Sequence, residues 1–86
     1  MSKPIPSAQD IIAWCTRFIS EHLNLAPAEI DPDAEFDGFG LDSALVTAML
    51  IGMEEWLGVE LSPSIVFEEP TLRRLGTTLS AQLQVA

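Results

Sequence analysis

Residues 40–58 read GLDSALVTAMLIGMEEWLG, and this stretch decides the fold because it carries a helix start, a buried face and a helix stop. Asp42 is a strong N-cap residue, which places Ser43 in the first turn of the helix. Gly58 suits the left-handed position that follows a helix C-terminus. We therefore predict a helix over residues 43–57. Its buried face is predicted to consist of Val46, Met49, Leu50, Met53 and Leu57.

The opposite face of this helix mixes small, apolar and acidic side chains. Scattered apolar residues are common on protein surfaces and need no function. This stripe, however, begins directly beside Ser43, and that continuity favours a surface that binds partner proteins. The stripe and its flanks consist of Ala44, Ala48, Ile51, Glu55, Leu45, Thr47 and Glu54.

A second long helix is predicted on the N-terminal side. Ser7 and Asp10 fit a capping box, and the helix should end near residues 23–25, before Pro27. Its apolar positions recur at helical spacing: Ala8, Ile11, Ile12, Cys15, Phe18, Ile19 and Leu23. The acidic connection over residues 26–41 is long for so small a domain, which is typical of a functional loop or one tied to the core. The apolar residues expected to anchor this connection in the core are Ile30, Phe36, Phe39 and Leu41.

Two further helices are predicted on the C-terminal side. Ser62 and Pro63 fit an N-cap and a first helical residue, and Pro70 keeps this helix short. Thr71 can cap a last helix, whose apolar seam is Leu72, Leu75, Leu79 and Leu83. No strand-like alternation competes with these periods. The expected fold class is all-α, with three main helices, one short helix and a long loop between the first two.

Size and charge limit the classes of function. The chain has 86 residues, which suits one domain over residues 1–86 with one thin core over about residues 7–84. Thirteen acidic and four basic residues give a net charge of −9. Such a charge repels nucleic acids and anionic membranes, and it favours partners with basic patches.

The remaining chemistry-bearing residues suggest neither a metal site nor a catalytic site. Cys15, the single cysteine, cannot form an intrachain disulfide or a cysteine-rich zinc site, and it falls on an apolar stripe. His22 fits packing or capping at a helix C-terminus. The sequence shows no apolar run of about 20 residues and no basic-then-apolar start, so we expect neither a membrane span nor a secretory signal. We expect a cytoplasmic monomer.

Ser43 is the candidate functional residue, and its setting favours modification over catalysis. A catalytic serine needs a base within hydrogen-bond reach and a group that orients the base. The lone His22 belongs to another predicted helix, and ionised Asp42 can only accept hydrogen bonds. A phosphoester on Ser43 would meet free backbone N–H groups and the positive end of the helix dipole. A turn followed by an ordinary cap would also explain residues 40–43 taken alone.

The motifs, taken in order, resemble those of acyl carrier proteins, and most of all the carrier domains of modular polyketide synthases and their discrete relatives. FGLDS at residues 39–43 is followed at the matching distance by EWLGV at 55–59 and PSIVFEEPT at 63–71. The similarity covers roughly residues 8–83 and implies an acyl-carrier-like helical bundle. Discrete fatty-acid carriers generally lack the Val-Phe-x-x-Pro-Thr ending, and peptidyl carriers more often have histidine before the serine. The resemblance therefore favours polyketide pathways, and hybrid pathways stay open.

The resemblance also implies a cofactor and partners. Ser43 would receive the phosphopantetheine arm of coenzyme A through a phosphodiester, and acyl, malonyl-type or aminoacyl groups would ride on its thiol as thioesters. Asp42 matches the acidic residue that assists recognition by the phosphopantetheinyl transferase. The other implied partners are an acyltransferase or an acyl or aminoacyl ligase, and a ketosynthase or other polyketide synthase enzymes. The chain would be a substrate of these enzymes and not a catalyst.

The docking surface expected for these partners lies mainly on the helix that starts at Ser43. Ala44 stands where the family commonly has leucine, which suggests a surface fitted to a particular partner. Two other classes remain as alternatives: an acidic helical adaptor without a prosthetic group, and a small hydrolase that would need a base the sequence does not show. The residues predicted to bind partners are Ala44, Leu45, Thr47, Ala48, Ile51, Glu54, Glu55 and Glu68.

Overall fold

The computed structural model describes residues 5–85 as a helical protein. Its helices are α1 (Ala8–Leu23), α2 (Ser43–Leu57), α3 (Ile65–Glu68) and α4 (Leu72–Val85). Two short 3₁₀ helices, η1 (Pro27–Glu29) and η2 (Phe36–Phe39), lie between α1 and α2. Extended pairing within residues 5–85 is limited to one isolated bridge between Glu35 and Thr71. The expected all-α class, with three main helices and a short one, is confirmed.

The ends of α1 follow from local hydrogen bonds that the sequence predicts. The Ser7 hydroxyl accepts the N–H of Asp10 at 3.1 Å, and the Asp10 carboxylate accepts the N–H of Ser7 at 3.0 Å. This is the predicted capping box. The helix ends at Asn24, which adopts the left-handed conformation with φ +57°. Asparagine tolerates this conformation better than most residues.

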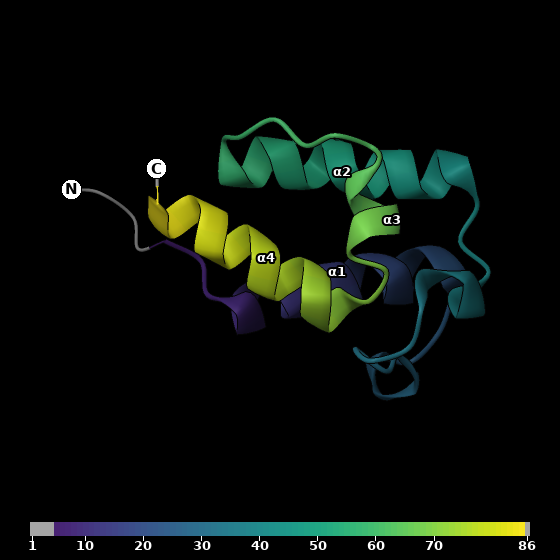
Figure 1. Ribbon diagram of the computed structural model, residues 1–86. Coiled ribbons are helices and arrows are strands. Elements are labelled where there is room, and N and C mark those ends of the chain that lie inside the picture. Colours follow the sequence, from purple (N-terminus) through teal and green to yellow (C-terminus); the bar gives the residue numbers. More distant parts are fainter. Residues whose placement is uncertain (1–4, 86) are drawn as a thin grey trace.

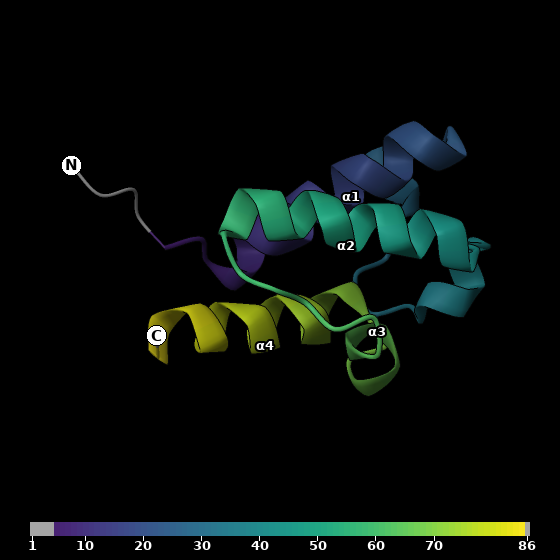
Figure 2. The same cartoon turned by 90° about the horizontal axis from the view of Figure 1, so that it is seen from above.

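The three long helices share one core. α1 and α4 pack against each other, and α2 lies across this pair (Figure 1). The segment after α2 runs back along the outer side of α2 before it reaches α3 (Figures 1 and 2). α1, α2 and α4 all turn their predicted apolar stripes inward. The largest fully buried side chains are Ile11, Ile19, Met49, Met53, Leu72, Leu75 and Leu79.

The buried cysteine belongs to this core, as predicted. Cys15 is 1% exposed, and its Sγ lies 3.4 Å from Sδ of Met53. Burial raises the pKa of the Cys15 thiol to about 12, because the thiolate would lose its hydration. Cys15 is therefore a small apolar core residue and not a reactive thiol.

The connection between α1 and α2 is tied to the core as expected. Ile30 and Phe36 are buried, and Phe39 and Leu41 are partly buried against the same cluster. The structure adds the 3₁₀ helices η1 and η2 to what the sequence indicated as an irregular loop. The connection thus reaches the start of α2 as a segment anchored in the core.

No helix within residues 5–85 has the length and apolar character needed to cross a bilayer.

The start of the short helix differs from the prediction. Ser62 and Pro63 were expected to open it, but α3 begins at Ile65, and Ser64 is its N-cap. The Ser62 carbonyl accepts the N–H of Ile65 at 3.0 Å, and the Ser62 hydroxyl accepts the N–H of Ser64 at 3.3 Å. Ser62 therefore organises a turn ahead of α3. This turn satisfies the N–H groups of Ser64 and Ile65.

Candidate functional site

The site is organised by the N-terminus of α2. Asp42 is in an extended conformation, and its carboxylate accepts the N–H of Leu45 at 2.8 Å. Its carbonyl accepts the N–H of Val46 at 3.0 Å. Gly40 precedes it with φ +74°, a conformation that favours glycine. The turn and the cap together place Ser43 as the first residue of α2, and Ser43 is exposed. The predicted N-cap and helix start are confirmed.

Ser43 opens onto a groove of about 300 Å³. The connection before α2 supplies one wall, the first turns of α2 a second, and α3 with its flanking prolines a third. Most of the lining residues are apolar, and the polar side chains come from Glu35, from the N-cap Asp42, and from Ser43 and Thr47 of α2. The lining residues are Glu35, Phe36, Leu41, Asp42, Ser43, Val46, Thr47, Pro63, Val66, Phe67 and Pro70.

Hydrogen bonds and an ion pair between distant parts of the chain hold the walls of the groove in place. The N–H of Phe36 donates to the carbonyl of Pro70 at 2.9 Å, and the N–H of Arg73 donates to the carbonyl of Pro32 at 2.9 Å. Arg73 also forms an ion pair with Asp33, with 2.5 Å between Nε and Oδ1. The hydrogen bond to the Arg73 guanidinium lowers the pKa of the Asp33 carboxyl. These bonds hold the acidic connection against the α3–α4 junction.

The groove does not contain the parts of a serine hydrolase. Nδ1 of His22 lies 2.8 Å from the carbonyl oxygen of Phe18, and its ring stacks on the Phe18 ring with 4.0 Å between centroids. His22 is therefore a packing and capping residue at the end of α1, as predicted. It is not among the residues that line the groove. Among residues 5–85, no three or more His, Cys, Asp or Glu side chains gather as a metal site would require.

The predicted partner surface is largely exposed, with two differences. Ala44, Thr47, Ala48, Ile51, Glu55 and Glu68 are exposed. Leu45 is only partly exposed. Glu54 is also partly buried, and its Oε2 accepts the N–H of Leu61 at 2.7 Å. Glu54 therefore fixes the segment after α2 and is less available to a partner than Glu55.

Sequence reasoning missed Phe67 as part of the site. Its side chain is 84% exposed, and it lines the groove together with Ser43. The apolar run of residues 65–67 reads as the face of a short buried helix, so nothing in the pattern indicates that its last member points outward. Pro70 is the residue that could have indicated this exposure, because a proline there limits the helix to about one turn. A helix of one turn can bury only part of an apolar run.

Comparisons with known proteins agree with this geometry. The family model described as "phosphopantetheine attachment site" matches residues 16–79, which include Ser43. The chain is 28% identical over 80 residues to the acyl carrier protein TtuC of Teredinibacter turnerae, covering 93% of this chain and 92% of that protein. It is 36% identical over 64 residues to polyketide synthase PksN of Bacillus subtilis, covering 74% of this chain but only 1% of that synthase.

A solved structure shares the fold over nearly its whole length. The free-standing peptidyl carrier protein from Acinetobacter baumannii is 26% identical, with a TM-score of 0.86 and coverage of 92% of this chain and 99% of that one. The family model describes a phosphopantetheine attachment site, and the structural neighbour is a carrier protein. The chain therefore belongs to the phosphopantetheine attachment site family, as a carrier protein whose covalent cofactor is phosphopantetheine and which is not itself a catalyst.

Proposed function

We propose that the Ser43 hydroxyl is the point at which the phosphopantetheine arm is attached. The observation that carries this proposal is the position of Ser43: it is exposed, follows the capping Asp42, and opens onto an apolar groove. On the arm, the protein would carry acyl, malonyl-type or aminoacyl intermediates in a polyketide or hybrid pathway. The acyl carrier and polyketide synthase relatives support the polyketide context.

The residues around Ser43 fit a phosphodiester. The first backbone N–H groups of a helix have no partner within the helix, and the helix dipole is positive there. A phosphate on Ser43 would therefore meet favourable charge, as anions do at helix N-termini. Ala44 and Ala48 are small and exposed, so an enzyme surface can approach the attachment point closely. The arm supplies the thiol on which thioesters form, and the chain supplies position and charge.

The proposed partners follow from the charge of this surface. The phosphopantetheinyl transferase would recognise Asp42, and an acyltransferase or ligase and a ketosynthase would then approach Ala48, Ile51 and Glu55. The net charge of −9 supports fast and weak encounters with basic enzyme surfaces.

We further propose one carrier domain over residues 1–86, acting as a cytoplasmic monomer. Residues 1–4 and 86 lie outside the described part of the chain.

Intact-protein mass spectrometry tests the attachment site. The purified chain is incubated with coenzyme A and a broad-specificity phosphopantetheinyl transferase, and we expect the mass of one arm per chain. Ser43→Ala should gain no mass. Ser64→Ala is the matched control, because Ser64 is also an exposed serine at a helix start beside the groove. An arm on Ser43→Ala would refute the assignment, and an unmodified wild-type chain would favour the adaptor function instead.

A second measurement addresses the cargo. The mass of the thioester on protein isolated from its native host should correspond to an acyl or malonyl-type group, or in a hybrid pathway to an aminoacyl group. An unacylated arm on all chains during active biosynthesis would argue against a carrier role in that pathway.

A further inference from the structure

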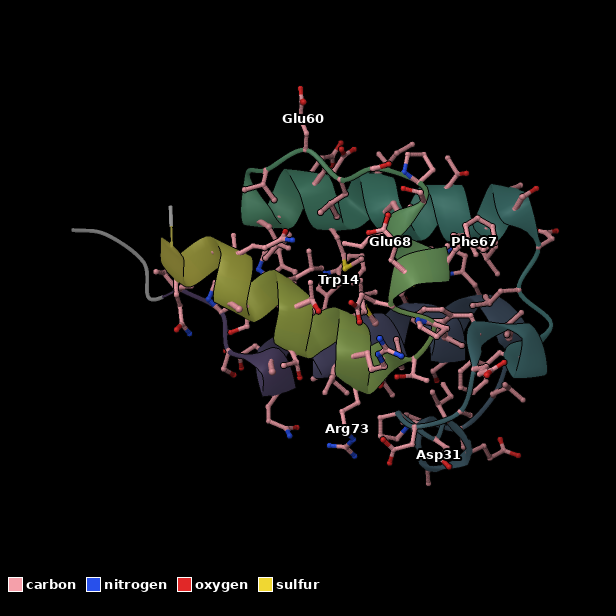
Figure 3. All side chains as sticks on the ribbon, viewed as in Figure 1. Trp14, Asp31, Glu60, Phe67, Glu68 and Arg73 are labelled. Carbon is pink, nitrogen blue, oxygen red and sulfur yellow. The ribbon has the colours of Figure 1, made fainter. Side chains whose placement is uncertain are left out.

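Phe67 is the most exposed large apolar side chain in the described part of the protein. It is 84% exposed, compared with 52% for Ile5, 50% for Ile51 and 40% for Trp56. Leaving so much of an aromatic ring in water is unfavourable relative to burying it. Phe67 projects from α3 (Figure 3), and its ring lines the same groove as Ser43. The most exposed apolar group thus lies at the site where the arm is proposed to be attached.

The outward direction of Phe67 is fixed by the way α3 is held. Ile65 is buried in the core, and Val66 is partly buried in the groove wall. The N–H of Phe67 donates to the carbonyl of Ser64 at 2.9 Å, and the N–H of Glu69 donates to the carbonyl of Ile65 at 2.8 Å. Within the single turn of α3, Ile65 faces the core and Phe67 faces solvent. The ring is therefore presented to whatever approaches the groove.

The charges around Phe67 indicate what approaches. Glu35 and Asp42 lie on the other walls of the groove, and Glu68 is the exposed neighbour of Phe67 on α3. Glu68 is further oriented by the Ser64 hydroxyl, which donates to its Oε2 at 3.3 Å. Of the basic side chains in residues 5–85, none lines the groove. An apolar ring among carboxylates is complementary to an apolar pocket with a basic rim.

We infer that Phe67 is a specificity-determining contact, which inserts into an apolar, basic-rimmed pocket of the enzymes that load or extend the acyl group on the arm. This inference rests on the proposed attachment of the arm at Ser43. Buried aromatic anchors contribute a large share of the affinity of small interfaces. Phe67 would extend the partner surface of α2 across the groove, so that the enzyme engages both sides of the attachment point. An enzyme without such a pocket would leave the ring in water and bind weakly.

The test uses holo protein, in which the arm has been confirmed by mass before any transfer is measured. A purified malonyl-coenzyme A:acyl carrier protein transacylase serves as the probe enzyme, with malonyl-coenzyme A as donor. Phe67→Ala should lower kcat/KM by about 10- to 100-fold, mainly through KM, because it removes a binding contact and leaves the thiol unchanged. Phe67→Leu keeps an apolar side chain and should retain most of the rate. Ile5→Ala removes an exposed apolar side chain that does not line the groove, and it should match wild type.

The outcomes separate this inference from the proposed function. If the wild-type chain gains no arm, the proposed function fails before Phe67 is tested. If holo Phe67→Ala is acylated as fast as wild type, the inference is wrong and the arm assignment stands. The hydrolysis rate of the malonyl thioester is measured without any enzyme, and it should be equal in wild type and Phe67→Ala. Faster hydrolysis in Phe67→Ala would show that the ring shelters the cargo within this chain, which would overturn the partner role.

Discussion

The α1–α4 pair is closely packed, whereas the α2–α3 side of the molecule is open to solvent. Between α1 and α4, Gly76 lies so close to α1 that a Cβ there would be 2.9 Å from the carbonyl oxygen of Ala8. On the other side, α3 and the start of α2 enclose a groove of about 300 Å³, and Phe67 remains in solvent. At Gly76 the closed side has no space for an added methyl group. The open side has space and exposed groups, but its walls are held by hydrogen bonds.

Packing that stabilises the fold and groups that are exposed to solvent thus occupy separate parts of a very small domain. The apolar seam of α4 is buried against α1, where packing contributes to the free energy of unfolding. The groove needs only a stable frame, because the proposed arm and partners would act on it from outside. Substitutions on the closed side should therefore lower the free energy of unfolding and leave the rate of acyl transfer unchanged. Substitutions on the open side should lower the rate of acyl transfer and leave the free energy of unfolding unchanged.

The largest stability effect is expected for Leu79→Ala. Leu79 is 1% exposed on α4, and its truncation leaves a cavity that the neighbouring helices can fill only in part. The free energy of unfolding should fall by about 2–5 kcal/mol, a large fraction of the total for so small a domain. Urea denaturation followed by circular dichroism measures this change. At a temperature where the variant is folded, loading of the arm should proceed at the wild-type rate, and a specific loading defect would break the proposed separation.

A smaller loss is expected for Gly76→Ala, with Gly52→Ala as the matched comparison. The new Cβ at position 76 would meet the backbone of α1, so the helices must separate, which costs about 1–3 kcal/mol. At position 52 the Cβ would lie 2.9 Å from the edge of the Trp14 ring, and a side chain can move more easily than a backbone. Both variants gain up to about 1 kcal/mol of helix propensity. Thermal melts should therefore show Gly76→Ala as the less stable variant, and the reverse order would refute this packing account.

The smallest effects on stability are expected on the exposed face of α2, where the readout is the rate of acyl transfer. Glu55→Lys should slow transfer at low salt because it weakens the attraction to basic enzymes, and added salt should reduce the difference from wild type. Ile51→Asp should slow transfer even at high salt, because it places a charge against an apolar contact. Both positions are exposed, so circular dichroism should show folded proteins. Wild-type rates for both variants at every salt concentration would place recognition elsewhere, in the connection over residues 31–37 or near Glu68 and Glu69.

Much of the helical framework could be predicted from the sequence, because local signals and periodicity agree along the long helices. The capping box at Ser7, the left-handed Gly58 and the Leu72–Leu75–Leu79 seam all specify their positions through short-range rules. The same rules placed Asp42 and Ser43 correctly at the start of α2. These features depend on residues within a few positions of one another.

The features that escaped prediction depend on distant contacts. Glu54 binds the backbone of Leu61, Phe36 bonds to Pro70, and Arg73 pairs with Asp33. The groove exists only because these segments meet, and no periodicity along the chain reports such meetings. The exposure of Phe67 has the same origin, since the burial of Ile65 decides which residues of the single turn of α3 can face the core.

The most direct test of the central claim is to locate the arm on the unaltered protein. The wild-type chain is treated with coenzyme A and a phosphopantetheinyl transferase, digested, and examined by fragmentation mass spectrometry. We predict one phosphopantetheine per chain, carried on the peptide that contains the start of α2, with fragment ions that assign it to the Ser43 side chain. An arm on any other residue, or a chain that gains none, would contradict the account.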